Sequence, residues 1–294
     1  MTVLALDIGG TKIAGGLVDG TGRLLRQATR PTPAEAPFDA VCAVVSELAP
    51  DSVSAVGIAC AGPVDAVTGT VAPINIPAWR DFPLVDGVRD LLGVPVALAG
   101  DGLCMALGEH WLGAGQGSDA MLGMVVSTGV GGGLVLDGRP FGGRTGNAGH
   151  VGHVVAEPDG EPCSCGGRGC VETVASGPSI VRWARAQGWV GADAGELAKA
   201  ALTGDDVASA AFRRAGRAVA MGVVATAAVC DLDLAVIGGG VAQVGGLLLD
   251  PVRETIAEHA RLSYLRGLRV EPAKLGTAAG LYGAAALAFH HSLS

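Results

Sequence analysis

Three cysteines and two histidines are concentrated in one glycine-rich stretch, which reads GNAGHVGHVVAEPDGEPCSCGGRGCVE from Gly146 to Glu172. Grouped thiolates in a reducing compartment usually bind a metal ion, and a structural zinc ion takes four ligands. The candidate ligands are Cys163, Cys165, Cys170 and either His153 or His150. The spacing of the first two cysteines is tighter than in most zinc fingers, so free thiols and a redox pair are alternatives. On composition the stretch predicts a structural zinc site.

The whole-chain composition is that of a globular protein. Of 294 residues, 49% are hydrophobic and 16% are charged, which excludes a disordered chain or a coiled coil. A formal net charge of -8 argues against a nucleic-acid partner. The N-terminus does not resemble a signal peptide, and the longest apolar run, Ala218 to Cys230, is shorter than the roughly 20 residues that cross a bilayer. We expect a cytoplasmic protein without a membrane partner, whose other cysteines (Cys42, Cys60, Cys104 and Cys230) are core thiols.

Short apolar runs alternate with glycine turns along the chain, as is typical of an α/β protein. The predicted strands VLALDIGG and KIAGGLVDG flank a turn that carries Asp7, Thr11 and Lys12. The strand VPVALAG delivers Asp101 at its carboxyl end, where ligands gather in parallel sheets. The stretch MLGMVVSTGVGGGLVLDG repeats the strand, turn and strand order, which indicates an internal duplication with a second lobe beginning near Asp119.

The remaining pattern predicts further strands at VSAVGIAC and LAVIGGG and a polar connection over 29–37. Helices are expected over 38–48, 103–110, 176–187, 195–202, 207–230, 246–258 and 277–290.

Three glycine-rich turns could hold phosphate groups, at Gly9–Thr11, Thr128–Gly133 and Gly238–Gly240. A strand that enters such a turn exposes backbone N–H groups, and glycine lets an anion approach them. None of the turns has the spacing of a P-loop or of the dinucleotide fingerprint, and each alone could be a plain hairpin. Together they favour a bound nucleotide. Phosphoryl transfer would also need a carboxylate for magnesium and a base for the attacking hydroxyl.

Seven motifs in sequence order resemble the ROK family of bacterial sugar kinases and repressors. They are DIGGTK (Asp7–Lys12), GPVD (Gly62–Asp65), NIPAW (Asn75–Trp79), STGVGGG (Ser127–Gly133), the His153–Cys170 cluster with Glu172, ASGPS (Ala175–Ser179) and IGGG (Ile237–Gly240). The resemblance covers nearly the whole chain. It implies a duplicated actin-like ATPase (ribonuclease H-like) α/β fold with two lobes around a central cleft.

The resemblance also implies the bounds of the two lobes and the ligand that each binds. Residues 1–118, completed by the C-terminal helix over 277–294, would form the N-terminal lobe on the sugar side. Residues 119–276 would form the C-terminal lobe, with the nucleotide side, the zinc loop and the oligomer contacts. ATP, Mg²⁺ and structural Zn²⁺ are the implied cofactors, and a homodimer or homotetramer is the implied assembly.

The functional residues of the family match individual positions of this sequence. Asp101 matches the catalytic base that takes the proton from the 6-hydroxyl of the sugar, and Asp7 matches the residue that orients magnesium through water. The implied phosphate-binding residues are Gly9, Gly10, Thr11, Lys12, Thr128, Gly129, Gly131, Gly238, Gly239 and Gly240. The implied sugar-binding residues are Asn75, Gly100, Asp101, His150, His153 and Glu172. The implied zinc ligands are His153, Cys163, Cys165 and Cys170. Without the resemblance, Asp101 could be a helix N-terminal acid and Glu172 a surface acid.

Three positions depart from the family pattern. Gly100 stands where an Asn usually precedes the catalytic Asp, Leu103 replaces a second Asn, and His150 replaces a Glu. Because sites built for particular hydroxyls discriminate strongly, these changes put the sugar in doubt, although neutral drift is an alternative. We expect a glucokinase-like hexose kinase. The alternatives are a kinase for kanosamine, glucosamine or an N-acetylated hexosamine, and a sugar-binding protein without activity. A repressor is disfavoured because the strand beginning at Val3 leaves no room for a DNA-binding domain ahead of it.

Overall fold

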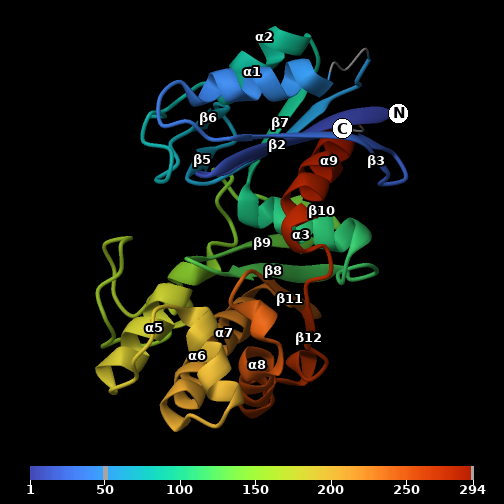
Figure 1. Cartoon of the computed structure of the whole chain (residues 1–294). Helices are drawn as coiled ribbons and strands as arrows, with labels where there is room; N and C mark the ends of the chain where they lie inside the picture. Colours follow the sequence, from blue (N-terminus) through green and yellow to red (C-terminus); the bar gives the residue numbers. More distant parts are fainter. Residues whose placement is uncertain (49–51, 293–294) are drawn as a thin grey trace. The chain divides into compact units, whose positions relative to one another are not determined.

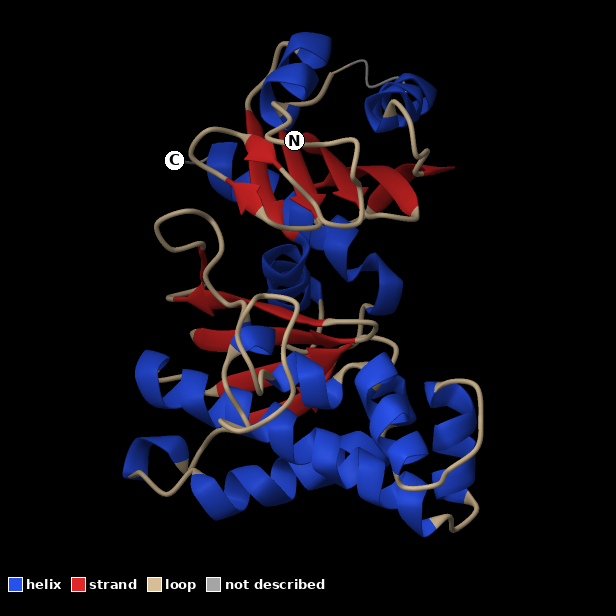
Figure 2. Cartoon of the chain, turned by 90° about the vertical axis from the view of Figure 1, so that its left-hand side faces the viewer, coloured by secondary structure: helices blue, strands red, loops and turns tan. Residues whose placement is uncertain are grey.

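The structure is a computed structural model that describes residues 1–48 and 52–292. The chain folds into two compact units. Unit 1 comprises Met1–Gly117, Gly133–Gly149 and Leu275–Ser294, and unit 2 comprises Ser118–Gly132 and His150–Lys274. The sequence-based division at residues 118 and 276 stays a prediction. Figures 1 and 2 show the sheets and the helices that cover them.

The elements of the first part of the chain are β1 (Thr2–Ile8), β2 (Lys12–Asp19), β3 (Leu24–Pro31), α1 (Pro37–Leu48), β4 (Val56–Cys60), β5 (Val64–Asp65), β6 (Thr70–Val71), α2 (Leu84–Leu92), β7 (Val96–Gly100) and α3 (Asp101–Leu112). Those of the middle part are β8 (Ala120–Val126), β9 (Val130–Leu136), β10 (Arg139–Phe141), η1 (Val151–His153), α4 (Val171–Ala175), α5 (Gly177–Ala186), α6 (Ala194–Leu202) and α7 (Asp206–Cys230). The last part contains β11 (Leu234–Gly238), η2 (Ala242–Val244), α8 (Gly246–His259), η3 (Ser263–Leu265), β12 (Arg269–Pro272), η4 (Gly276–Ala278) and α9 (Ala279–Ser292).

The two five-stranded sheets have the same internal order. One runs β3-β2-β1-β4-β7 and the other β10-β9-β8-β11-β12, so in each the first strand lies between the second and the fourth. β1 is antiparallel to β2 and parallel to β4, and β11 is parallel to both β8 and β12. The predicted α/β class and the predicted duplication are therefore confirmed.

Strand β1 separates two apolar layers in unit 1. Leu4, Leu6 and Ile8 belong to the core beneath α1 and α2, whereas Val3 and Ala5 belong to the core that α9 closes from the other face. Figure 1 shows these helices on opposite faces of the sheet. Because successive side chains of a strand alternate, Asp7 follows the phase of Val3 and Ala5 and lies on the α9 side.

Helices α3 and α9 approach each other through glycines. A Cβ on Gly108 would lie 2.4 Å from the carbonyl oxygen of Ala279, and one on Gly283 would lie 1.6 Å from that of Cys104. These contacts are between backbones, so no side-chain rotation can relieve them. The close packing fixes α3, the helix that begins at Asp101, against the sheet. Within residues 1–48 and 52–292, none of the helices has the length and apolar character needed to cross a bilayer.

Substitution of Gly283 by Ala should separate α3 from α9 and destabilise the protein by about 1–3 kcal/mol, the usual cost of overpacking. Urea unfolding measures this loss. Gly20→Ala is the matched control, since the nearest atom to a Cβ there is 4.0 Å away. Equal stability of the two variants would contradict the close approach of the helices.

Candidate active site

Asp7 lies on β1 next to the first glycine turn. The turn is closed by a hydrogen bond from the Gly9 N–H to the Lys12 carbonyl oxygen (3.0 Å), and the side chains of Thr11 and Lys12 are exposed. Burial, followed by the charge of Asp101, raises the pKa of Asp7 to about 6, and Lys12 acts in the opposite direction. The carboxylates of Asp7 and Asp101 are therefore close enough to repel each other.

Asp101 is the first residue of α3 and follows the carboxyl end of β7. It is exposed, and its Oδ1 accepts a hydrogen bond from the N–H of Gly102 (2.7 Å). β7 is parallel to β4, which is parallel to β1, so Asp7 and Asp101 both come from the carboxyl edge of the sheet. The carboxylate of Asp101 thus lies at the N-terminus of α3, an end of a helix that stabilises negative charge.

Asn75 lies against the first turn. A Cβ on Gly10 would be 2.8 Å from the Cβ of Asn75, so only glycine allows this contact. At Gly100, by contrast, a Cβ would meet no atom within 4 Å. The structure thus brings Asn75 to the first glycine turn and leaves open space at Gly100, beside Asp101.

In unit 2 the other two glycine turns lie against each other. The Ser127 N–H donates to the Gly129 carbonyl oxygen (2.8 Å) and closes the turn between β8 and β9. Gly239 follows β11 with a φ of +96°, and a Cβ on it would be 2.3 Å from the carbonyl oxygen of Val126. Gly131 has no atom within 4 Å of the position a Cβ would take. The two turns therefore lie against each other, and the Glu172 side chain reaches the first of them, 2.8 Å from the position that a Cβ on Gly129 would take.

A pocket of about 720 Å³ opens beside these turns. Its lining residues are Ser127, Thr128, Gly177, Pro178, Val181, Arg182, Arg185, Ala192, Asp193, Ala194, Gly240 and Val241. Two arginines there are already engaged, since Arg182 pairs with Glu161 and Arg185 donates to the carbonyl oxygens of Gly191 and Ala192. Sequence reasoning did not assign the lining from α5 and the start of α6, although the ASGPS motif marks the beginning of α5.

The cysteines and His153 form one cluster. Their ligand atoms, one from each of His153, Cys163, Cys165 and Cys170, all lie within 4.8 Å of one another. The Sγ of Cys163 is 3.7 Å from the Nδ1 of His153, and the Sγ atoms of Cys165 and Cys170 are 3.8 Å apart. A tetrahedron with bonds of about 2.3 Å has edges of about 3.8 Å, whereas a disulfide needs about 2.05 Å. The donor set fits a tetrahedral metal ion. The ring of His150 is 6.3 Å from that of His153, and His150 is not one of the four ligands.

Val130 connects the metal cluster to the second glycine turn. Cys170 caps α4, and Glu172 in this helix accepts a hydrogen bond at Oε2 from the N–H of Val130 (2.9 Å). On the other side, a Cβ on Gly152 would be 1.9 Å from the carbonyl oxygen of Val130. Both polar groups of the Val130 backbone thus face segments that carry metal ligands. Sequence reasoning did not find this contact, because no motif marks Val130.

The same strand order in both sheets, with glycine turns after β1, β8 and β11, defines an actin-like ATPase fold. The family model "ROK family" matches residues 3–291, and the chain belongs to this family.

Two curated relatives and one crystal structure cover nearly the whole chain. The chain is 34% identical to a glucokinase of Thermotoga maritima, over 98% of this chain and 97% of the relative. It is 37% identical to an N-acetylmannosamine kinase of Citrobacter koseri, over 98% and 99% of the two chains. A ROK family glucokinase of Streptomyces griseus, crystallised with glucose and AMPPNP, superposes with a TM-score of 0.81, with 38% identity over 99% of this chain and 100% of the other.

The raised pKa of Asp7 makes stability depend on pH. Between pH 3.8 and about 6 the unfolded chain has lost the Asp7 proton while the folded protein keeps it. The folded state then binds more protons, so stability falls as pH rises through this window, by up to about 3 kcal/mol. Asp7→Asn removes this loss and should be more stable than the wild type above pH 6, without magnesium or nucleotide, but not below pH 4.

Urea unfolding of both proteins from pH 3.5 to 8 measures this difference. Asp90→Asn, an exposed position on α2, serves as the control and should follow the wild-type curve. Parallel curves for Asp7→Asn and wild type would contradict the buried charge.

Proposed function

We propose that this chain transfers the γ-phosphoryl group of ATP to the 6-hydroxyl of a hexose, as a glucokinase-like enzyme. The observation that carries the proposal is the pair of carboxylates, Asp7 and Asp101, at the carboxyl edge of one sheet beside a glycine turn. The glucokinase relatives, and the glucose and AMPPNP bound in the Streptomyces griseus structure, support both substrates.

We assign Asp101 as the base that accepts the proton of the sugar 6-hydroxyl. As the 6-hydroxyl oxygen forms its bond to the γ-phosphorus, the bond from this phosphorus to the bridging oxygen of ADP breaks, and the hydroxyl proton passes to Asp101. A carboxylate is a weak base, so its main contribution is to orient the hydroxyl and to accept the proton late. The N–H of Gly102 donates to Oδ1 of Asp101 and holds the carboxylate at the start of α3.

We assign the three glycine turns and Lys12 to binding the phosphates of ATP. The residues are Gly9, Gly10, Thr11, Lys12, Thr128, Gly129, Gly131, Gly238, Gly239 and Gly240. Asp7 is assigned to orient the magnesium ion through water. Bound magnesium neutralises charge on the transferring phosphate. The pocket beside Thr128 and Gly240 has the volume and the partly apolar lining that suit an adenosine group.

Zinc is the metal we propose for the cluster of His153 with the three cysteines, because three thiolates and one imidazole are a common structural zinc set. We assign the sugar hydroxyls to Asn75, Asp101, His150, His153 and Glu172, with Gly100 providing space. The homodimer or homotetramer stays a prediction.

An amino-sugar kinase is the second candidate. The N-acetylmannosamine kinase of Citrobacter koseri is as similar to this chain as the glucokinases are. The open space at Gly100 could accept a larger substituent on the sugar. Values of kcat/KM for glucose, glucosamine, kanosamine and N-acetylmannosamine decide between the candidates, and no turnover with any of them would remove the enzyme assignment.

Asp101→Asn should lower kcat by about 10²–10⁴-fold, because the amide cannot accept the proton. ATP affinity, measured by calorimetry, should stay within about twofold. The exposed Asp90→Asn serves as the control and should keep full turnover. Retained activity of Asp101→Asn would exclude this residue as the base.

Loss of the metal should weaken nucleotide binding as well as sugar binding, because Glu172 and η1 hold Val130 beside the phosphate turn. The exposed ligand Cys165 can be replaced by Ser, with Cys42→Ser as the control outside the cluster. We expect Cys165→Ser to lose zinc by elemental analysis and to bind AMPPNP at least tenfold more weakly in calorimetry. A zinc-free protein with unchanged AMPPNP affinity would contradict the link through Val130.

A further inference from the structure

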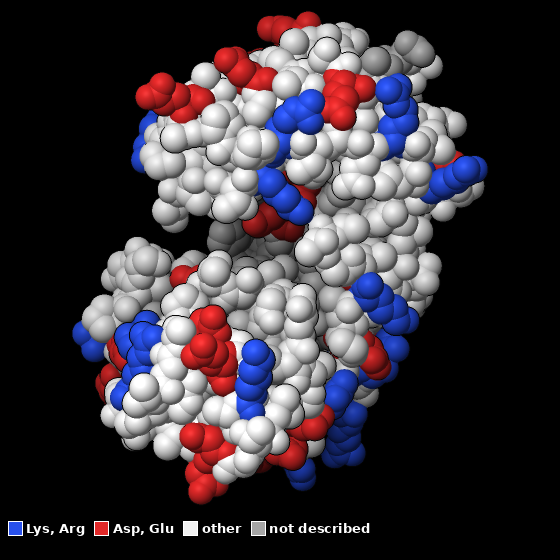
Figure 3. Space-filling view, viewed as in Figure 1, with Lys and Arg blue, Asp and Glu red and all other residues white. Residues whose placement is uncertain are grey.

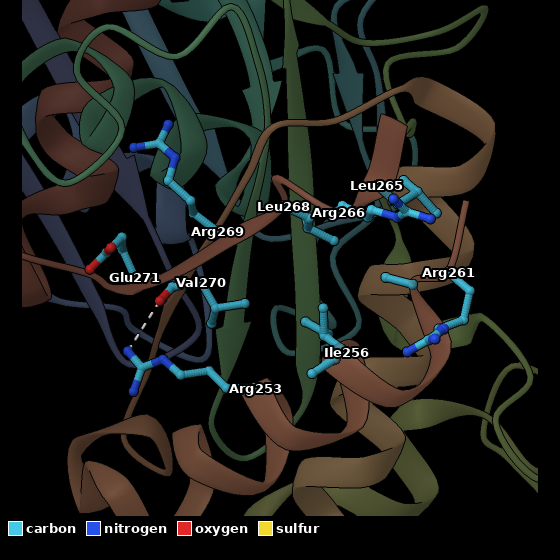
Figure 4. A pocket seen from close by; sticks show the side chains of 11 residues that line it. Arg253, Ile256, Arg261, Leu265, Arg266, Leu268, Arg269, Val270 and Glu271 are labelled. Atoms are coloured by element: carbon cyan, nitrogen blue, oxygen red, sulfur yellow. Dashed lines mark hydrogen bonds between the residues drawn. The ribbon is translucent and has the colours of Figure 1, made fainter. Parts of the chain in front are cut away.

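Unit 2 contains a second pocket, of about 580 Å³, that the proposed reaction does not use. α8, η3, β12 and the loops between them line it (Figure 4). Its charged lining residues are Arg253, Arg261, Arg266, Arg269 and Glu271. Four arginines around one pocket contrast with the net charge of -8 of the chain. Figure 3 shows basic side chains gathered at the end of unit 2 that carries α8 and β12.

Two of the four arginines already have partners in the fold. Arg253 donates to the carbonyl oxygen of Val270 (3.1 Å) and contacts Asp250, and Arg269 pairs with Asp233 at 2.8 Å. In the described part of the chain, the guanidinium groups of Arg261 and Arg266 have no hydrogen bond or ion pair, and both side chains are exposed. The pocket therefore presents two positive charges that nothing within the unit neutralises.

The charges are arranged asymmetrically. Figure 4 shows Arg261 and Arg266 on one side of the pocket and Arg253, Arg269 and Glu271 on the other. The single acid thus lies away from the two unpaired arginines. The buried side chains of Ile256, Leu265 and Val270 supply an apolar lining between the two sides. A ligand could place an anionic group on one side and a less polar body along this lining.

We propose that this pocket binds an organic phosphomonoester, with its phosphate on Arg261 and Arg266. Guanidinium groups bind phosphate oxygens through paired N–H donors. A phosphomonoester dianion matches the two unpaired positive charges, whereas one carboxylate matches only half of them. The volume is large enough for a small organic body in addition to the phosphate. Sugar phosphates and nucleoside monophosphates share this chemistry.

The test titrates wild-type protein with glucose 6-phosphate, AMP, inorganic phosphate and acetate. Magnesium, AMPPNP and glucose are present at saturation so that the reaction site is occupied. We expect binding of a phosphomonoester at one site per chain and no binding of acetate. The double variant Arg261→Gln/Arg266→Gln should bind the phosphomonoester at least tenfold more weakly. Its thermal stability should be unchanged, because neither side chain has a partner within residues 1–48 and 52–292.

The matched control is Arg213→Gln/Arg217→Gln, which removes two exposed arginines of α7 from the same unit. It should bind like the wild type. Binding that both double variants weaken equally would show a general charge effect and overturn the proposal. Binding of acetate as tight as that of the phosphomonoesters, or no binding at all by the wild type, would also overturn it. The relative affinities for glucose 6-phosphate and AMP show whether the pocket prefers a sugar phosphate or a nucleoside monophosphate.

Discussion

Close approach between backbones, permitted only by glycine, is the constraint on which the rest of this structure depends. Gly283 brings α9 onto α3, Gly239 brings one phosphate turn onto the end of β8, and Gly152 brings η1 onto Val130. At each place a Cβ would lie within about 2.3 Å of a carbonyl oxygen. The glycines place no side chain of their own over the turns, whereas the N–H of Val130 is already bonded to the Glu172 carboxylate.

The two carboxylates of Asp7 and Asp101 repel each other, and Asp7 is largely buried. Asp7 is held on the α9 side of its sheet, where a Cβ on Gly280 would be 2.8 Å from its Oδ2. Burial and the neighbouring Asp101 both oppose its ionisation, so the unliganded protein carries an unfavourable charge arrangement. The magnesium ion proposed for this site would relieve such repulsion.

The segments that carry the clustered cysteines and His153 contact the glycine turn between β8 and β9. Its ligands come from η1, from the loop before α4 and from the N-cap of α4. Because η1 and Glu172 both contact the Val130 backbone, a metal that joins these segments also restricts the residue next to Gly129. A metal ion bound by these four residues would therefore contribute to the position of a glycine turn that is separate from them in sequence.

The sequence by itself determined the α/β class, the duplication, most of the helices and the grouping of the three cysteines, since hydrophobic period, glycine turns and cysteine spacing are local signals. The spacing alone left the choice between His150 and His153 open. It did not predict the strands β3, β5, β6, β10 and β12, and the connection predicted over 29–37 was wrong at its start, because β3 extends to Pro31. β3 and β12 are mostly exposed edge strands, and β5, β6 and β10 have only two or three residues, so no alternation of buried residues marks them. Only the tertiary structure decided that Glu172 bonds to Val130, that Asp101 raises the pKa of Asp7, and that Arg261 and Arg266 have no partner among the described residues. These facts depend on distances between segments far apart in the chain or on the contents of a whole unit, and no local pattern encodes them.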